Sequence, residues 1–515
     1  MPGHMEFEFN IRGEAAGKQR QEQPFNLLIL GNFCGQAAEL AGEAGEIIAK
    51  RRIVHVDLDN VDELWSLFSP YLQLQLGPLS IEWSPGDIDD FHPDQLYRTL
   101  PVFGDLRDMR NKLLDPGTAQ SALDEILSAG AVIEGEIAEA PGQPADAGPD
   151  ENAAGEDAGL MFERLLGRPA SQPPAQPAAT SELGKLDAFI RELVAPHIVN
   201  DPDPRVETAV ESVDLAIAEL MRSILHHDDF QALESCWRSL FDMVSELELD
   251  EDLHLYVCDI RREELLAGLP EPGTELQECA LFQLLVERRR QATDDTPWTV
   301  IVGDYFFGRD SEDIALLTAL GAAAAVNRGI FLGGARPGML GCSTTAELAD
   351  ARYWSSAGDD STLWQSLRTS PVADRIGLAL PRVLARLPYG EETEEIDSFH
   401  FEEMPQRNHE DYLWANPAFA CGRLLAESFT RQGWAMEPGT HVDLGTLPAH
   451  NYTEDGESKL QPCAELLLSE STMVAMLDEG LMPLVSYRNQ NTAVLGRFQS
   501  IASPLRALAG PWRTG

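Results

Sequence analysis

Apolar and polar residues in the first 120 positions of the chain follow the periods of both strands and helices. Every second side chain is apolar at residues 6–11, so Phe7, Phe9 and Ile11 share one face of an extended strand. The pattern that follows predicts strands over residues 25–33, 53–56 and 72–83 and helical stretches over residues 61–68 and 96–109. The first of these strands is almost continuously apolar, which indicates burial on both faces. We therefore predict a compact α/β unit over residues 1–120.

The pattern weakens over residues 121–182. Residues 121–160 hold ten acidic side chains and no Lys or Arg, and residues 141–180 are dominated by Pro, Ala, Gly and Gln. Such a composition buries too little apolar surface to offset the entropy of ordering, so it predicts a flexible acidic Pro/Ala-rich linker. One short apolar island interrupts it, formed by Leu160, Met161, Phe162, Leu165 and Leu166. It is either a chance cluster in a tether or a short helix that docks on a partner.

A second and larger α/β unit is predicted over residues 183–515. Its opening is helical, and strands then alternate with helices. The clearest elements are helices over 206–225, 230–240 and 311–326 and strands over 253–258 and 298–305. Residues 391–411 carry nine acids against one Arg and are expected to form an exposed loop.

The charge balance excludes several classes of partner. Against 38 Lys and Arg stand 85 Asp and Glu, which gives a net charge of −47. Non-specific binding to nucleic acid or to anionic membranes is therefore not expected. The N-terminus lacks the pattern of a signal peptide and no apolar run is long enough to insert into a membrane, so a cytoplasmic location is expected. The seven cysteines occur singly, without a C-x-x-C pair, which predicts neither disulfides nor a zinc site.

Few residues suggest chemistry. Residues 226–229, His-His-Asp-Asp, are adjacent and so cannot all face one ion on a helix; a helix cap at Asp228 or Asp229 fits them better than a metal site. Asp304 follows an apolar strand, where ligands of α/β sheets gather, but a turn-forming role fits it better than a catalytic one. No hydrolase elbow or metalloprotease motif is present. We predict no catalytic residue, no metal and no cofactor.

Several strings in chain order resemble one family of proteins. Residues 89–97, DDFHPDQLY, resemble the small sheath subunit of bacterial type VI secretion systems (TssB), and residues 27–35 are similar to the first core strand of that family. After the linker, residues 224–240 and residues 303–307 are similar to the large sheath subunit (TssC), as are later strings at 380–390, 401–403, 412–416 and 433–434. The chain thus resembles a fusion of both subunits.

The resemblance implies a fold class and partners. It implies two sheath-type α/β (α+β) domains, with mixed sheets flanked by helices, that assemble with copies of themselves or other sheath subunits around an inner tube protein. A baseplate and an AAA+ disassembly ATPase are the further partners implied, and contraction would eject the tube. It also implies that the island at residues 160–166 is the docking helix for the ATPase, and that the strand with Phe7, Phe9 and Ile11 joins the sheet of a neighbouring protomer.

The resemblance also assigns a structural role to individual residues. These are Asp90, Phe91, His92, Pro93, Trp237, Arg238, Gly303, Asp304, Tyr305, Pro381, Arg382, Pro388, Tyr389, Trp414, Gly433 and Trp434. The large-subunit part ends earlier than the family pattern, which leaves a non-polymerising accessory or baseplate-associated protein as an alternative. An acidic cytoplasmic hydrolase that uses Asp304 is the more distant alternative.

Overall fold

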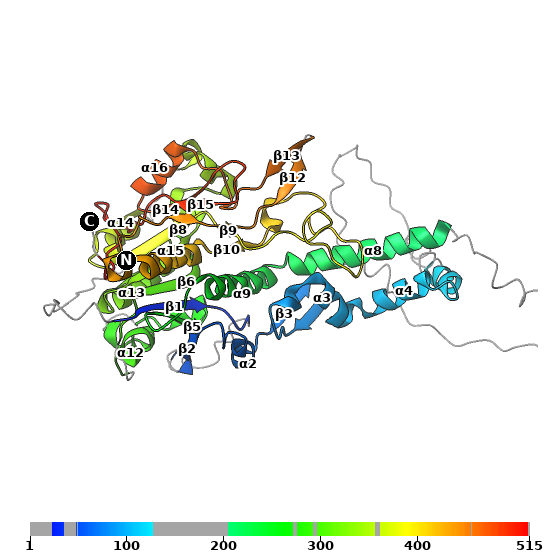
Figure 1. Cartoon of the computed structure of the whole chain (residues 1–515), viewed down its shortest axis with the longest axis horizontal. Coiled ribbons are helices and arrows are strands. Elements are labelled where there is room, and N and C mark those ends of the chain that lie inside the picture. Colours follow the sequence, from blue (N-terminus) through cyan, green and yellow to red (C-terminus); the bar gives the residue numbers. More distant parts are fainter. Residues whose placement is uncertain are drawn as a thin grey trace, which may run out of the picture.

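The computed structural model describes residues 23–35, 48, 50–126, 204–270, 276–291, 296–355, 361–454 and 456–512. Its centre is a nine-stranded mixed sheet with the order β11-β15-β14-β8-β7-β6-β1-β5-β2 (Figure 1). The strands of this sheet are β1 (Phe25–Gly31), β2 (Ile53–Val56), β5 (Leu253–Asp259), β6 (Val300–Phe307), β7 (Ile330–Ala335), β8 (Ile376–Leu380), β11 (Asp443–Leu444), β14 (Met482–Ser486) and β15 (Ala493–Leu495).

Strand β1 comes from the N-terminal unit but lies inside the sheet of the C-terminal unit. It pairs in parallel with β5, where Phe25 is opposite Leu253, and with β6, where Leu27 is opposite Val300. All seven residues of β1 are buried. This explains the nearly continuous apolar run, because a parallel strand in the middle of a sheet has no solvent-facing side.

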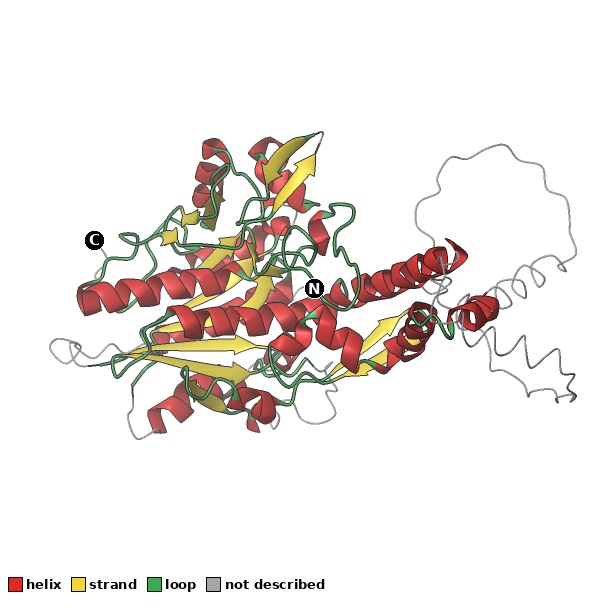
Figure 2. Cartoon of the chain, turned by 45° about the vertical axis from the view of Figure 1, so that its right-hand side comes forward, coloured by secondary structure: helices red, strands yellow, loops and turns green. Residues whose placement is uncertain are grey.

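The side chains of β1 divide between two hydrophobic cores. Phe25, Leu27 and Ile29 point to a core that also contains residues of helices α9 (Asp228–Glu246) and α15 (Pro417–Gln432). Leu28 and Leu30 point to the opposite core, which contains residues of helix α13 (Ser311–Val326). Helices thus cover both faces of the sheet (Figures 1 and 2).

The rest of the N-terminal unit packs along helices α8 (Pro204–Leu225) and α9. It consists of α2 (Glu63–Phe68), the hairpin β3 (Leu72–Leu76) and β4 (Leu79–Trp83), and the helices η2 (Asp89–Phe91), α3 (Pro93–Thr99), η3 (Pro101–Phe103) and α4 (Gly104–Leu114). Trp65 of α2 stacks on Trp237 of α9, with ring centroids 3.7 Å apart and an interplanar angle of 11°. Helices α4 and α8 run side by side away from the sheet (Figure 1), joined by the ion pair of Arg110 and Asp214.

Smaller elements complete the C-terminal unit. The helices are α10 (Arg262–Ala267), η5 (Leu276–Glu278), α11 (Ala280–Phe282), η6 (Gln283–Glu287), α12 (Arg288–Gln291), η7 (Pro337–Leu340), η8 (Thr345–Ala349), η9 (Ala351–Tyr353), α14 (Ser361–Thr369), η10 (Ala373–Arg375), η11 (His409–Asp411), η12 (Gly433–Ala435) and α16 (Glu470–Asp478). Two short ladders pair β9 (Val383–Leu384) with β10 (Trp414–Ala415) and β12 (Asn451–Glu454) with β13 (Glu457–Leu460).

The expected mixed sheet flanked by helices is confirmed, but the two units share one large sheet and one continuous core instead of each having its own. The boundaries at residues 120 and 183 remain predictions about sequence units. The strand expected over 72–83 is a hairpin, whose turn includes Gly77 at a φ of 56°. The Gly-Pro pair at 77–78 is a turn signal within the alternating pattern. The predicted strand at 6–11, the linker core at 127–182 and the island at 160–166 lie outside the described residues.

Cutting the chain between the two units should leave them bound to each other. We expect that a specific protease site inserted at residues 170–176, once cleaved in the folded protein, yields two fragments that co-elute in size-exclusion chromatography. The reason is that β1 is hydrogen-bonded on both sides by strands of the other fragment. The same digest run in urea serves as the control for complete cleavage. Separate elution of the fragments in native buffer would contradict the shared sheet.

Candidate functional site

A neutral cluster of buried charges joins helix α9 to the segment that follows β9. The guanidinium of Arg386 donates hydrogen bonds to both oxygens of Glu234 and to both oxygens of Glu403, the shortest at 2.7 Å for each carboxylate. The side chains of these carboxylates are 0% and 1% exposed. Arg238, one helical turn after Glu234, donates a further bond of 2.7 Å to it. Two positive and two negative charges are therefore balanced within the protein.

Tyr389 belongs to the same cluster. Its backbone N–H donates to Glu403 at 2.7 Å, and its hydroxyl accepts a hydrogen bond from Arg238 at 3.2 Å. The guanidinium of Arg386 lies 4.3 Å from the centroid of the Tyr389 ring, within the range of a cation–π contact. Glu403 has its oxygens fully engaged, so its charged form is strongly favoured.

The pKa values follow from this arrangement. Burial by itself would raise the pKa of Glu403, but the charge of Arg386 and the hydrogen bonds from His226, Arg386 and the Tyr389 N–H outweigh it and lower the pKa to about 2. Burial opposes the charged form of Arg386 as well, yet Glu234 and Glu403 raise its pKa well above the ordinary value. Burial raises the pKa of Tyr389. All four charged groups thus remain ionised at neutral pH.

The acidic segment 391–411 connects this cluster to the N-terminal unit. The carboxylate of Asp94, at the start of α3, accepts hydrogen bonds from the backbone N–H groups of Asp397 and Ser398 at 3.0 and 2.9 Å. The ring of His92 packs edge-on against Tyr389, with centroids 5.0 Å apart. The expectation of an exposed loop is therefore wrong for part of this segment, because Ile396, Phe399, Phe401 and Glu403 are buried. The apolar residues among the acids were the signal for burial.

A second ion cluster lies around Arg382 in the segment between β8 and β9. Arg382 pairs with Glu465 at 2.6 Å and with Glu410 at 3.0 Å, and its guanidinium lies over the ring of Trp414 at 5.7 Å. Burial would raise the pKa of Glu465, but the hydrogen bond from His409 and the charge of Arg382 lower it below the ordinary value. Arg382 and Trp414, which the resemblance singled out separately, thus meet in one cluster.

The other signature residues occupy packing positions. Trp237 donates its indole N–H to the carbonyl of Phe33 at 3.0 Å, which fixes the chain after β1. At the other end of β1, Trp434 donates to the carbonyl of Gln23 at 2.7 Å and stacks near Phe25. The remaining ones lie in the core or next to it; they are Asp90, Phe91, Pro93, Pro381, Pro388 and Gly433.

Residues 226–229 form a helix cap, as expected, but the capping residue is a histidine. The side chain of His227 accepts a hydrogen bond from the backbone N–H of Asp229 at the start of α9, so the assignment of the cap to Asp228 or Asp229 is wrong. His92 caps α3 in the same way by accepting from Asp94. In the described ranges, no three His, Cys, Asp or Glu side chains are grouped as ligands for a metal ion.

Asp304 is partly buried on β6 and has no base or nucleophile arranged around it. Burial raises the pKa of this carboxyl to about 6, against hydrogen bonds from Cys236 and Asn416 that lower it. Its neighbours are structural, since a side chain at Gly303 would collide with Phe331, and the hydroxyl of Tyr305 donates to the carbonyl of Ile260 at 2.7 Å. Cys236 is fully buried, and its pKa is raised well above the ordinary value. The surroundings of Asp304 favour packing over catalysis.

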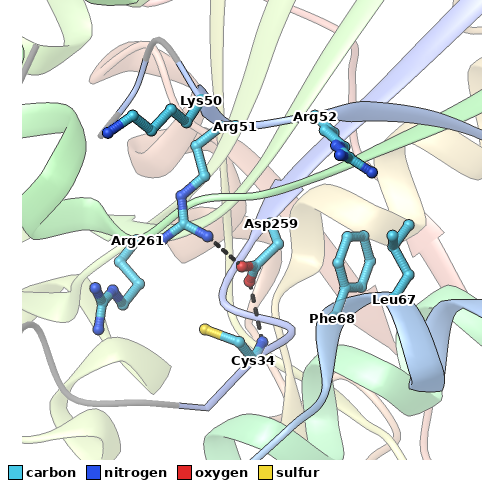
Figure 3. A pocket seen from close by; sticks show the side chains of 8 residues that line it. All are labelled: Cys34, Lys50, Arg51, Arg52, Leu67, Phe68, Asp259 and Arg261. Carbon is cyan, nitrogen blue, oxygen red and sulfur yellow. Dashed lines mark hydrogen bonds and ion pairs between the residues drawn. The ribbon is translucent and has the colours of Figure 1, made fainter. Parts of the chain in front are cut away.

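A pocket of about 310 Å³ opens near the carboxyl ends of β1 and β5 (Figure 3). At its floor Arg51 pairs with Asp259 and with Glu264, both at 2.5 Å. The other oxygen of Asp259 accepts hydrogen bonds from the backbone N–H groups of Phe33 and Cys34 at 2.9 and 3.0 Å. Within the described residues no helix combines the length and hydropathy of a bilayer-spanning segment.

Comparisons with known proteins place this architecture among tail sheath proteins. The family model described as "EvpB/VC_A0108, tail sheath N-terminal domain" (VipB) matches residues 207–502, more than half of the 515 residues, and the model "Type VI secretion system, VipA, VC_A0107 or Hcp2" matches residues 4–128. The chain belongs to the VipB tail sheath family and carries a VipA-type unit in the same polypeptide. The resemblance to a fusion of small and large sheath subunits is thereby confirmed.

A curated relative supports the same family. The chain is 32% identical over 317 residues to the "Type VI secretion system sheath protein TssC1" of Pseudomonas aeruginosa. This alignment covers 60% of the chain and 63% of the relative, so the chain spans less than two thirds of the relative's length.

Replacing Arg386 should destabilise the protein strongly. We expect Arg386→Met to lower the free energy of unfolding by about 3–5 kcal/mol, because two buried carboxylates lose their counter-charge. Urea unfolding followed by tryptophan fluorescence measures the change. The matched control is Arg352→Met, which removes an exposed ion pair with Asp350 and should leave the urea midpoint unchanged. Similar midpoints for the two variants would contradict the role of the cluster.

Asp304→Asn should stabilise the fold at neutral pH. The folded-state pKa of Asp304 is about 6 against an ordinary 3.8, so the protonated carboxyl favours the folded state below pH 3.8, and this contribution is lost as the pH rises through 6. Asn cannot ionise, so the variant should gain on the order of 2 kcal/mol over the wild type at pH 7 and little at pH 4. Urea midpoints measured at both pH values test this. A gain that is the same at pH 4 and pH 7 would rule out ionisation of Asp304 as its cause.

Proposed function

We propose that this protein is a structural subunit of the contractile sheath of a type VI secretion system, with the small and large units built into one protomer. The observation that carries the proposal is the position of β1. This strand of the VipA-type unit lies between β5 and β6 of the VipB-type unit, so both units form one continuous body. A protein that transmits force along a polymer needs such a body, because a loose joint between its units would dissipate the movement.

The covalent connection supports the same role. It enforces one small unit for each large unit and raises the effective concentration of each for the other. The Arg386 cluster and the contact of Asp94 with the 391–411 segment hold the two units in one orientation. The partners in this proposal are further copies or other sheath subunits, the inner tube protein, the baseplate and an AAA+ disassembly ATPase that binds the island at 160–166. The proposed location is the cytoplasm, and the proposed role requires no catalysis.

Electron microscopy of the purified protein with its inner tube protein tests the proposal. We expect regular hollow cylinders around the tube, because each protomer contains both sheath units. Phe7→Asp combined with Phe9→Asp should prevent cylinder formation if the strand at residues 6–11 joins a neighbour through its apolar face. Glu8→Gln, on the opposite face of that strand, is the matched control and should assemble normally.

Monodisperse particles in every mixture with the tube protein would overturn the proposal in favour of a non-polymerising accessory protein. Normal cylinders from the Phe7→Asp, Phe9→Asp variant would leave the sheath proposal standing and refute the role of the strand.

A further inference from the structure

Two runs of three basic residues come together on this acidic chain. They are Lys50-Arg51-Arg52 and Arg288-Arg289-Arg290, and they contain six of the 38 basic residues. The guanidinium of Arg288 donates a hydrogen bond of 2.7 Å to the carbonyl of Arg51, so the runs are in contact although they are more than 230 positions apart in sequence. Lys50, Arg52, Arg288 and Arg290 are exposed. Positive charge is therefore concentrated at one place on a protein with a net charge of −47.

The pocket of about 310 Å³ opens at this basic surface (Figure 3). Lys50, Arg51, Arg52 and Arg261 line it, together with Asp259. Arg51 binds Asp259 and Glu264, and Arg261 also binds Glu264, so two carboxylates face four cations. Arg52 makes no ion pair within the described part of the chain, and the Nε–H of Arg51 is buried without a hydrogen-bond acceptor there. The pocket thus retains an excess of positive charge and an unused donor.

The geometry favours a peptide over a small phosphate-bearing ligand. In α/β sheets, the backbone N–H groups after a central strand often bind phosphate. Here the N–H groups of Phe33 and Cys34 already donate to Asp259, so a carboxylate of the protein holds that position. The remaining donors are long side chains near the mouth, and one wall is apolar, formed by Phe68 and by Leu67, which is 42% exposed. Such a surface suits a chain in which acidic and aliphatic residues alternate.

The sequence contains one segment of this kind. Residues 131–140, AVIEGEIAEA, combine Glu134, Glu136 and Glu139 with the aliphatic residues Val132, Ile133 and Ile137. No Lys or Arg occurs between residues 121 and 160, so nothing within the segment's neighbourhood competes for its carboxylates. Three carboxylates on a short extended peptide match the guanidinium and ammonium groups around the pocket, and the aliphatic residues match Leu67 and Phe68.

The position of the pocket argues that the segment comes from another copy. The backbone N–H of Tyr71 donates to the carbonyl of Cys34, so the N-terminal unit leads away from the pocket at the start of β3. The hairpin β3–β4 and helices α3 and α4 then separate the pocket from Ile126, the last described residue before the segment (Figure 1). We propose that the pocket binds residues 131–140 of a second copy of this chain. The contact is heterologous, so it generates open chains of copies and not closed dimers.

This inference rests on the proposed assembly of copies, but its first test does not. A fluorescent peptide of residues 128–143 is titrated with the full chain, and anisotropy reports binding. We expect the Lys50→Glu, Arg52→Glu variant to weaken binding at least tenfold, and a peptide with Gln at 134, 136 and 139 to bind at least tenfold more weakly to the unchanged chain. Arg98→Glu with Lys112→Glu, exposed and away from the pocket, is the matched control and should bind like the wild type. Equal binding by the pocket variant overturns the proposal, as does displacement of the peptide by inorganic phosphate at concentrations where sulfate does nothing.

A complementation test addresses the second copy. In analytical ultracentrifugation, chains with Lys50→Glu, Arg52→Glu and chains with Glu134→Lys, Glu136→Lys should each remain monomeric at concentrations where the wild type associates. A mixture of the two should regain association, because the intact pocket of one variant meets the intact segment of the other. A mixture that stays monomeric overturns the contact between copies. If cylinders fail to form while the peptide binds as expected, the sheath proposal falls and the pocket assignment stands.

Discussion

The pairing of β1 with β5 and β6 is the interaction on which the rest of this structure depends. All seven residues of β1 are buried, and their side chains enter the cores on both faces of the sheet. Without β1, strands β5 and β6 would leave backbone N–H and C=O groups unpaired inside the protein, which is costly. The VipB-type unit therefore requires the VipA-type unit to complete its sheet, and the linker joins two parts that already form one core.

The ion clusters serve orientation more than stability. Removing charges such as Arg386, Glu234 and Glu403 from water costs several kcal/mol per ion, and the hydrogen bonds among them roughly offset this cost. What the cluster adds is geometry, since four hydrogen bonds from one planar guanidinium allow only one arrangement of α9 and the segment after β9. The segment 391–411 then reaches Asp94 of the other unit, so the same contacts fix both units.

Local patterns predicted the elements well where hydrophobic period and capping agreed. The helices expected at 206–225 and 311–326 correspond closely to α8 and α13, and the strand at 25–33 corresponds to β1. Errors arose where a turn or a cap broke the local rule. The Gly-Pro pair at 77–78 turned one expected strand into a hairpin, and His227 took a capping role usually given to Asp or Ser. Glu403 was missed because an acidic run suggested solvent, whereas the apolar residues beside it are buried.

The sequence alone determined the α/β class, the two units, the acidic linker composition and the family, because these depend on period, composition and short strings of neighbouring residues. Only the tertiary structure decided that β1 lies between β5 and β6, that Arg386 neutralises carboxylates at 234 and 403, and that two basic runs meet at one pocket. These contacts join residues far apart in the chain; Phe25 and Leu253 are opposite each other although 228 positions separate them. Backbone pairing and charge neutralisation follow distance in space, and the periodicity of a sequence carries no record of that distance.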